Sequence, residues 1–185
     1  MATNTKLKPF QAYDDHDVLG IFRYSGAIPV TAGTIVKSNG SGWRSDDCDT
    51  DLLGDVGLHY NNTVSQRYGV RAVCVDAGTG DSILGMLLND VREVDENGLP
   101  LKFYPRKAIE NNWVVSGQAS PILTKGWVLW SGTPNGSPAA GDTAYASGNG
   151  TLTNNTTNQN PASTVGKFWG SLNSDGYYLV KVNVL

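Results

Sequence analysis

Few residues of the types that perform nucleophilic chemistry have the spacing that such chemistry needs in this sequence. The two histidines, His16 and His59, lie in a polar N-terminal segment and beside Tyr60. Nucleophilic catalysis requires Ser, Thr or Cys next to a histidine that a third group orients. The sequence contains no G-x-S-x-G motif, and its Ser-Gly pairs are typical of turns. We therefore expect a protein that is not an enzyme.

Acidic residues cluster in two places, and each cluster imitates a known site. The spacing of Asp47, Asp49 and Asp51 resembles the start of a calcium loop, but Leu52 and Leu58 stand where that loop needs glycine and glutamate. A second group surrounds an expected turn and short helix and could supply the carboxylate pair of a glycosidase. This group is Glu93, Asp95, Glu96 and Glu110. We interpret both clusters as solvated charge and expect no metal.

The two cysteines are interpreted as reduced structural residues. Cys48 lies among aspartates and Cys74 in an apolar, strand-like run. No apolar block typical of a signal peptide or membrane helix occurs, which favours synthesis in the cytosol, where thiols stay reduced. The cysteines and histidines also lack zinc-ligand spacing, so no cofactor is expected.

Aromatic residues are the stronger candidates for a binding role. Tryptophan is enriched at protein interfaces and can also stack on sugar rings. Trp127 and Trp130 lie in one apolar run and would point to opposite faces of a strand, so at least one of them should be buried. We favour a subunit interface over a sugar platform. The candidates are Trp43, Trp127, Trp130, Tyr145 and Trp169.

Residues 1–17 are predicted to form an extended N-terminal arm. The segment is polar and aperiodic, and Phe10 and Tyr13 are its apolar side chains. Such an arm can become ordered by docking on a partner, with Lys6 and Lys8 adding charge. A frayed terminus is the alternative interpretation.

Length and composition indicate one small β domain. The chain has 185 residues, 22 of them glycine, and a net charge of −3 with 17% charged residues. Such a charge balance gives no basic field for nucleic acid and no reason to expect membrane binding. Short alternating runs and frequent turn signals predict eight to eleven strands in a small β-barrel or β-sandwich, of the β-tulip kind, over residues 18–185.

The expected elements position the aromatic candidates. Strands are predicted at 18–24, 33–37, 67–76, 83–91, 142–146, 150–153, 164–169 and 177–185, with 114–130 leading into the last group. Residues 105–112 are predicted to form the one helix, which we expect to plug a barrel end or fill a corner. The Asn/Thr/Gln-rich segment 154–163 should be mobile or ordered only by a partner.

An ordered set of motifs in the last seventy residues resembles tailed-bacteriophage capsid cement or decoration proteins. The set begins with Ser-Gly-Gln-Ala-x-Pro-Ile-Leu-Thr-Lys-Gly at 116–126 and Ala-Gly-Asp-Thr-Ala-Tyr at 140–145. It continues with Thr-Val-Gly-Lys-Phe at 164–168 and Asp-Gly-Tyr-Tyr-Leu-Val-Lys-Val at 175–182. The family-like part thus spans about 113–185, and the longer N-terminal half departs from small family members.

The resemblance implies a β domain that is not an enzyme and that stabilises an expanded virus head. Its partner would be the major capsid protein, whose subunits it bridges on the outside of the capsid, and it would be made and assembled in the host cytoplasm. The family also implies self-association, as a homotrimer or a dimer. A carbohydrate-binding or adhesion module on the virion surface is the alternative. The capsid or subunit interface is expected at Lys6, Lys8, Phe10, Tyr13, Trp43, Trp127, Trp130 and Trp169.

Overall fold

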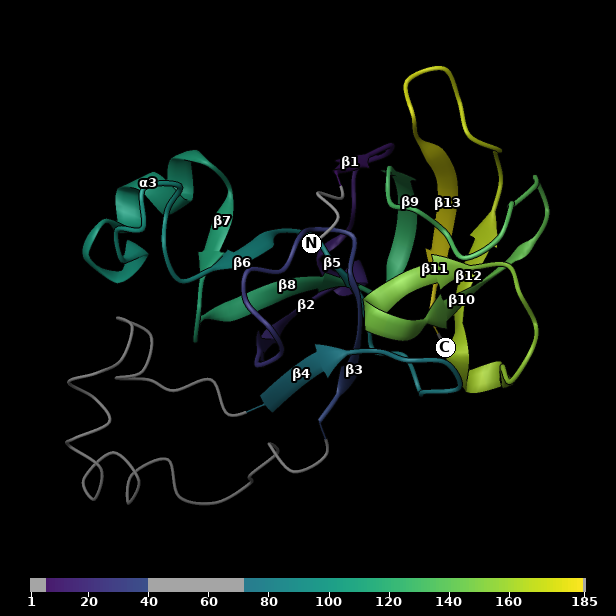
Figure 1. The fold of residues 1–185 in the computed structure, drawn as a ribbon, viewed down its shortest axis with the longest axis horizontal. Coiled ribbons are helices and arrows are strands. Elements are labelled where there is room, and N and C mark those ends of the chain that lie inside the picture. Colours follow the sequence, from purple (N-terminus) through teal and green to yellow (C-terminus); the bar gives the residue numbers. More distant parts are fainter. Residues whose placement is uncertain (1–5, 40–71, 185) are drawn as a thin grey trace.

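The computed structural model describes residues 6–39 and 72–184, and within them the fold is mainly β (Figure 1). These residues form thirteen strands and one short α-helix, which confirms the predicted fold class. Five of the strands close into a barrel. In their order around the barrel they are β2 (Val18–Tyr24), β4 (Ala72–Asp76), β3 (Ile35–Ser38), β5 (Gly85–Leu87) and β8 (Ala119–Leu123).

A six-stranded sheet, antiparallel throughout, lies beside the barrel (Figure 1). Its strands, in order across the sheet, are β1 (Leu7–Pro9), β9 (Lys125–Trp130), β13 (Tyr178–Asn183), β12 (Thr164–Phe168), β10 (Thr143–Ser147) and β11 (Thr151–Thr153). Alternation along β13 buries Tyr178, Val180 and Val182 on the inner face.

One hydrophobic core joins the barrel to this sheet. It contains Ile35, Met86 and Leu123 from the barrel together with Val128 and Phe168 from the sheet. All five of these side chains are fully buried. Because the barrel and the sheet share these contacts, they stabilise each other and form one packed unit.

The α-helix belongs to a small lobe outside the barrel. Helix α3 (Pro105–Glu110) follows the 3-10 turn Leu101–Phe103, begins with its proline, and is followed by Asn112 in the left-handed region at φ 54°. Of its two expected roles, plugging a barrel end or filling a corner, the first was wrong. It packs against β7 (Trp113–Val115), which pairs in parallel with β6 (Asp90–Arg92), around a separate cluster. That cluster is Leu101, Ala108 and Val115 with Trp113 at its edge, and we call residues 90–115 the helix lobe.

The segment 113–130 enters all three sheets in succession. Its first strand β7 lies in the helix lobe, β8 closes the barrel between β2 and β5, and β9 pairs with β13. The part of the chain that resembles decoration proteins therefore includes a barrel strand. It is not a module separate from the N-terminal half.

Two expectations about local structure were wrong. The predicted strand at 83–91 is divided into β5 and β6. The polar segment 154–163 is held by its own chain, because the Gln159 amide donates to the Ala146 carbonyl and the Asn160 amide to the Gly80 carbonyl. It ends in the 3-10 turn Pro161–Ser163, which Asn160 caps.

The N-terminal segment lies against the domain from residue 6 onward. Strand β1 is an edge strand on β9, and the 3-10 turn Asp15–Asp17 leads from it into the barrel. A further 3-10 turn, Gly148–Gly150, lies between β10 and β11. Removing the arm would uncover β9, so point substitutions are the better test of its contacts.

Candidate functional site

The outer face of the six-stranded sheet combines lysines with aromatic rings. Trp127 and Lys181 lie directly opposite each other on β9 and β13, and Lys167 lies opposite Lys181 on β12. Side chains that are directly opposite share one face of a sheet, so these three point away from the core. The aromatic and lysine residues gathered there form what we call the Trp–Lys face: Lys8, Trp127, Lys167, Trp169, Tyr177 and Lys181.

Ring and cation contacts hold the Trp–Lys face together. The rings of Trp127 and Trp169 lie 5.8 Å apart, centroid to centroid, at 53° to each other. The Lys181 ammonium lies 5.4 Å from the Trp127 ring and the Lys8 ammonium 4.7 Å from the Tyr177 ring. Trp169 is 50% exposed, so a large ring stays available to a partner. Such preordered aromatic groups lose little side-chain entropy on binding.

The charge of the six-stranded sheet is opposite to that of the whole chain. Its six strands contain Lys8, Lys125, Lys167 and Lys181 and no Asp or Glu. The net charge of the chain is −3. Positive charge is thus concentrated on one part of an acidic protein, which favours contact with an acidic surface.

The predicted arm residues adjoin the Trp–Lys face. The Phe10 amide donates to the Trp127 carbonyl at 3.1 Å while its side chain is 59% exposed. Tyr13 lies against Gly126, where a Cβ would come within 2.8 Å of its ring, and burial raises the pKa of the Tyr13 phenol. The Lys6 amide donates to the Ser131 hydroxyl at 2.8 Å, which fixes the start of β1.

Trp130 is a correction to the predicted contact residues. It is 1% exposed, its indole N–H donates to the Gly33 carbonyl at 3.1 Å, and it packs against Tyr178. Trp127 and Trp130 do point to opposite faces of β9, and Trp130 is the one in the core. Tyr145, the further aromatic candidate, is half-buried on β10. Trp43 and the aspartates of 46–55 lie outside the described residues.

Three of the four carboxylates considered for glycoside hydrolysis, Asp95, Glu96 and Glu110, are held in ion pairs in the helix lobe. Lys107 binds Asp95 at 2.7 Å and Glu96 at 2.8 Å, while Arg106 binds Glu110 at 3.0 Å. Asp95 also accepts the backbone N–H groups of Asn97 and Leu99. The Lys107 ammonium, and then these amides, lower the pKa of Asp95, and Lys107 likewise lowers that of Glu96. Asp95 is therefore a structural acceptor that fixes the turn before α3.

Acid is expected to loosen the helix lobe before the rest of the fold. Asp95 and Glu96 have lower pKa values folded than unfolded, so their contribution is complete above about pH 4.3 and is lost as the pH falls through the depressed values. Hydrogen exchange at pH 7 and pH 3 should show protection falling at residues 99–112 but kept in β13. Lys107→Met should remove most of this pH dependence. Equal protection at both pH values would contradict the assignment.

The thiol of Cys74 is free and fully buried. Burial, with a smaller contribution from the charge of Asp76, raises the pKa of this thiol to about 12. Because the thiolate is the nucleophilic form, Cys74 is unreactive near neutral pH. This agrees with the structural role predicted for it, whereas Cys48 lies outside the described residues.

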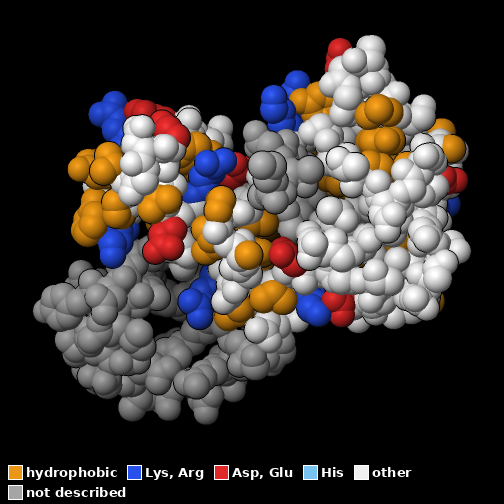
Figure 2. Space-filling view, viewed as in Figure 1, with side chains coloured by type: hydrophobic (Ala, Val, Ile, Leu, Met, Phe, Trp, Pro, Cys, Tyr) orange, Lys and Arg blue, Asp and Glu red, His pale blue; other side chains and the backbone are white. Residues whose placement is uncertain are grey.

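Sequence reasoning missed the exposed apolar surface of the helix lobe. Hydrophobic side chains gather there around α3 (Figure 2), and they are Val94, Leu99, Phe103, Tyr104 and Ile109. Apolar patches of this kind commonly mark binding sites. The adjacent aromatics Phe103 and Tyr104, directly before a helix-starting proline, were the available signal in the sequence.

Within 6–39 and 72–184 no group of histidine, cysteine or acidic side chains is arranged to hold a metal ion, and no helix is long and apolar enough to cross a membrane.

Comparisons with known proteins do not place this chain in a family. No family model, curated protein or solved structure matches the chain.

Proposed function

We propose that this chain is a virion structural protein that binds the outside of a bacteriophage capsid and bridges major capsid protein subunits. In this role it stabilises the expanded head. The observation that carries the proposal is the Trp–Lys face, a preordered aromatic surface with an exposed Trp169 ring and positive charge on an otherwise acidic chain. It adjoins the N-terminal residues that the sequence pattern predicts to dock on a partner.

The chemistry of this face suits a protein surface better than a small ligand. Interface cores are enriched in tryptophan, and a few such residues commonly carry most of the binding free energy. Lys8, Lys167 and Lys181 would pair with carboxylates of the capsid lattice, and Trp127 and Trp169 would be covered. Many identical sites on one particle, engaged by a linked oligomer, strengthen a modest contact by avidity. We extend the proposal to a homotrimer, with a dimer as the alternative, on the basis of the resemblance alone.

The double substitution Trp127→Ala/Trp169→Ala should abolish most capsid binding. Removal of two interface tryptophans commonly costs at least about 2 kcal/mol, which is roughly a thirtyfold loss in affinity. Binding is measured by cosedimentation of purified chain with expanded capsids that lack it, at several salt concentrations. Lys8→Glu/Lys181→Glu should give a similar loss and a weaker salt dependence.

Ile21→Ala is the matched control, because Ile21 is 54% exposed on barrel strand β2, outside the Trp–Lys face. It should bind as the unmodified chain does, and circular dichroism should show that all variants are folded. Capsids without the chain should also lose heat resistance and regain it on addition of the unmodified protein. Full binding by the tryptophan double variant, or unchanged head stability without the chain, would overturn the proposal.

A further inference from the structure

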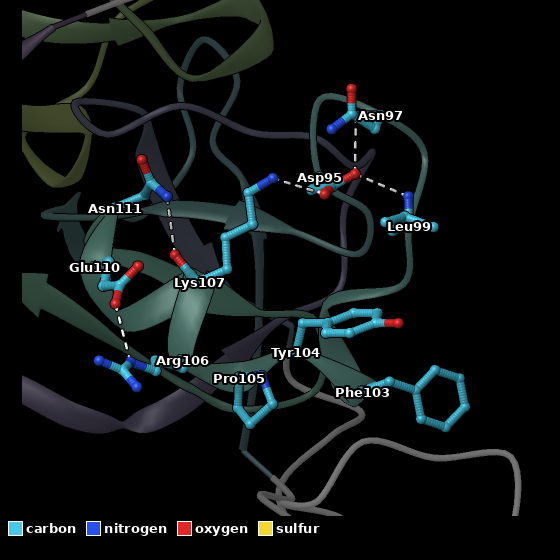
Figure 3. Close-up of a pocket in the computed structure, with 10 residues that line it drawn as sticks. All are labelled: Asp95, Asn97, Leu99, Phe103, Tyr104, Pro105, Arg106, Lys107, Glu110 and Asn111. Carbon is cyan, nitrogen blue, oxygen red and sulfur yellow. Dashed lines mark hydrogen bonds and ion pairs between the residues drawn. The ribbon is translucent and has the colours of Figure 1, made fainter.

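The helix lobe contains an open pocket on the far side of the barrel from the six-stranded sheet (Figures 1 and 3). Its volume is about 690 Å³, within the range of small-ligand sites. Its floor is the turn that Asp95 organises, and one side is α3. Phe103 and Tyr104 project at its edge, 68% and 54% exposed respectively (Figure 3).

The charges around the pocket are already paired with each other. Lys107 is shared between Asp95 and Glu96, and Arg106 is bound by Glu110. Three carboxylates against two cations leave a local charge of −1, which disfavours an anionic ligand. A metal ion or an organic cation would have to displace Lys107 or Arg106 from the carboxylates, which disfavours a cationic ligand as well. The pocket is therefore suited to a neutral ligand.

Polar side chains beside the aromatic rings remain available for hydrogen bonds to a ligand. The side-chain amide of Asn97 and the Tyr104 hydroxyl have no partner within the described residues, and the Asn111 amide uses only its N–H₂ group, toward the Lys107 carbonyl. Glu110 accepts one bond from Arg106 through a single oxygen. A fully apolar ligand would leave these groups unsatisfied, which costs binding free energy.

A sugar ring matches this combination, because its C–H face is apolar and its hydroxyls lie around its edge. From the pocket we infer that the helix lobe binds a neutral glycan, with one pyranose ring stacked on Phe103 or Tyr104. Asn97, Asn111 and the Arg106–Glu110 pair exchange hydrogen bonds with its hydroxyls. The open shape admits an internal unit of a longer chain. This inference is independent of capsid attachment, since it uses none of the residues of the Trp–Lys face.

The test uses the full chain and a printed panel of neutral oligosaccharides, among them maltoheptaose, cellohexaose and chitohexaose. Affinity electrophoresis and saturation-transfer NMR then measure how strongly the chain binds each glycan that the panel retains. Phe103→Ala/Tyr104→Ala should weaken binding by roughly tenfold or more, because stacking on an aromatic ring is lost. Asn97→Ala should weaken it by a smaller factor, and the acidic polysaccharide polygalacturonate should not compete.

Two controls separate this site from its alternatives. Trp127→Ala/Trp169→Ala should keep glycan binding while losing capsid binding, and Ile109→Ala should keep both, since Ile109 is exposed on α3 but does not line the pocket. Retention of no neutral glycan by the unmodified chain would overturn the inference. So would a Phe103→Ala/Tyr104→Ala variant that binds normally. Self-association that Ile109→Asp abolishes, without glycan binding, would reassign this surface to a contact between copies.

Discussion

Trp130→Ala is expected to destabilise the fold by about 4 kcal/mol or more, because it leaves a cavity where the barrel meets the six-stranded sheet. The Trp130 side chain is buried against Tyr178, and its indole N–H satisfies the carbonyl of Gly33 in the loop before β3. Its loss therefore removes both apolar contact and the partner of a buried acceptor. Urea unfolding followed by circular dichroism measures the change in the free energy of unfolding.

Trp169→Ala provides the matched comparison within the same sheet. The Trp169 ring is half exposed and contacts Trp127, so its removal should cost less than about 1.5 kcal/mol. The two substitutions should thus have opposite profiles. Trp130→Ala should lower stability strongly, and Trp169→Ala should affect capsid binding with little change in stability. Equal destabilisation by both would contradict the assignment of Trp130 to the core.

Local patterns in the sequence predicted much of the strand content and one face of several strands. The alternation of residues 177–185 separated the two faces of β13, and the proline at 105 identified the start of α3. The separation of Trp127 from Trp130 by three positions placed them on opposite faces. These predictions succeed because each depends on neighbours in sequence, which alternate or repeat with a fixed period.

The remaining features depend on contacts between distant segments. Which tryptophan is buried follows from the pairing of Trp130 with Leu7 and Tyr178, and no local pattern contains that information. The Trp–Lys face likewise exists because β1, β9, β12 and β13 are neighbours. In the helix lobe, a helix of six residues is too short for its periodicity to distinguish the buried Ala108 from the exposed Ile109. The pocket of the helix lobe was therefore not predictable from the sequence.

Gly166→Ala is expected to have an effect as large as that of Trp130→Ala, because the backbone of the neighbouring strand leaves no room for a side chain. A Cβ at Gly166 would overlap the Lys181 carbonyl oxygen and lie 3.1 Å from the Val182 Cα. Backbone atoms in a paired strand cannot move aside as a flexible side chain can, so β12 must shift away from β13. The expected cost is about 3 kcal/mol or more in the free energy of unfolding.

Gly20→Ala is the control for this prediction, since Gly20 also lies in a strand but has no atom within 4 Å of the added Cβ. It should leave stability unchanged or raise it slightly by restricting the unfolded chain. Strand β12 carries Lys167 and leads into Trp169, so displacement by Gly166→Ala should also reduce capsid binding in the molecules that remain folded. A Gly166→Ala variant as stable as Gly20→Ala would show that β12 and β13 are not paired in this register. The Trp–Lys face, which depends on that pairing, would then have to be reassigned as well.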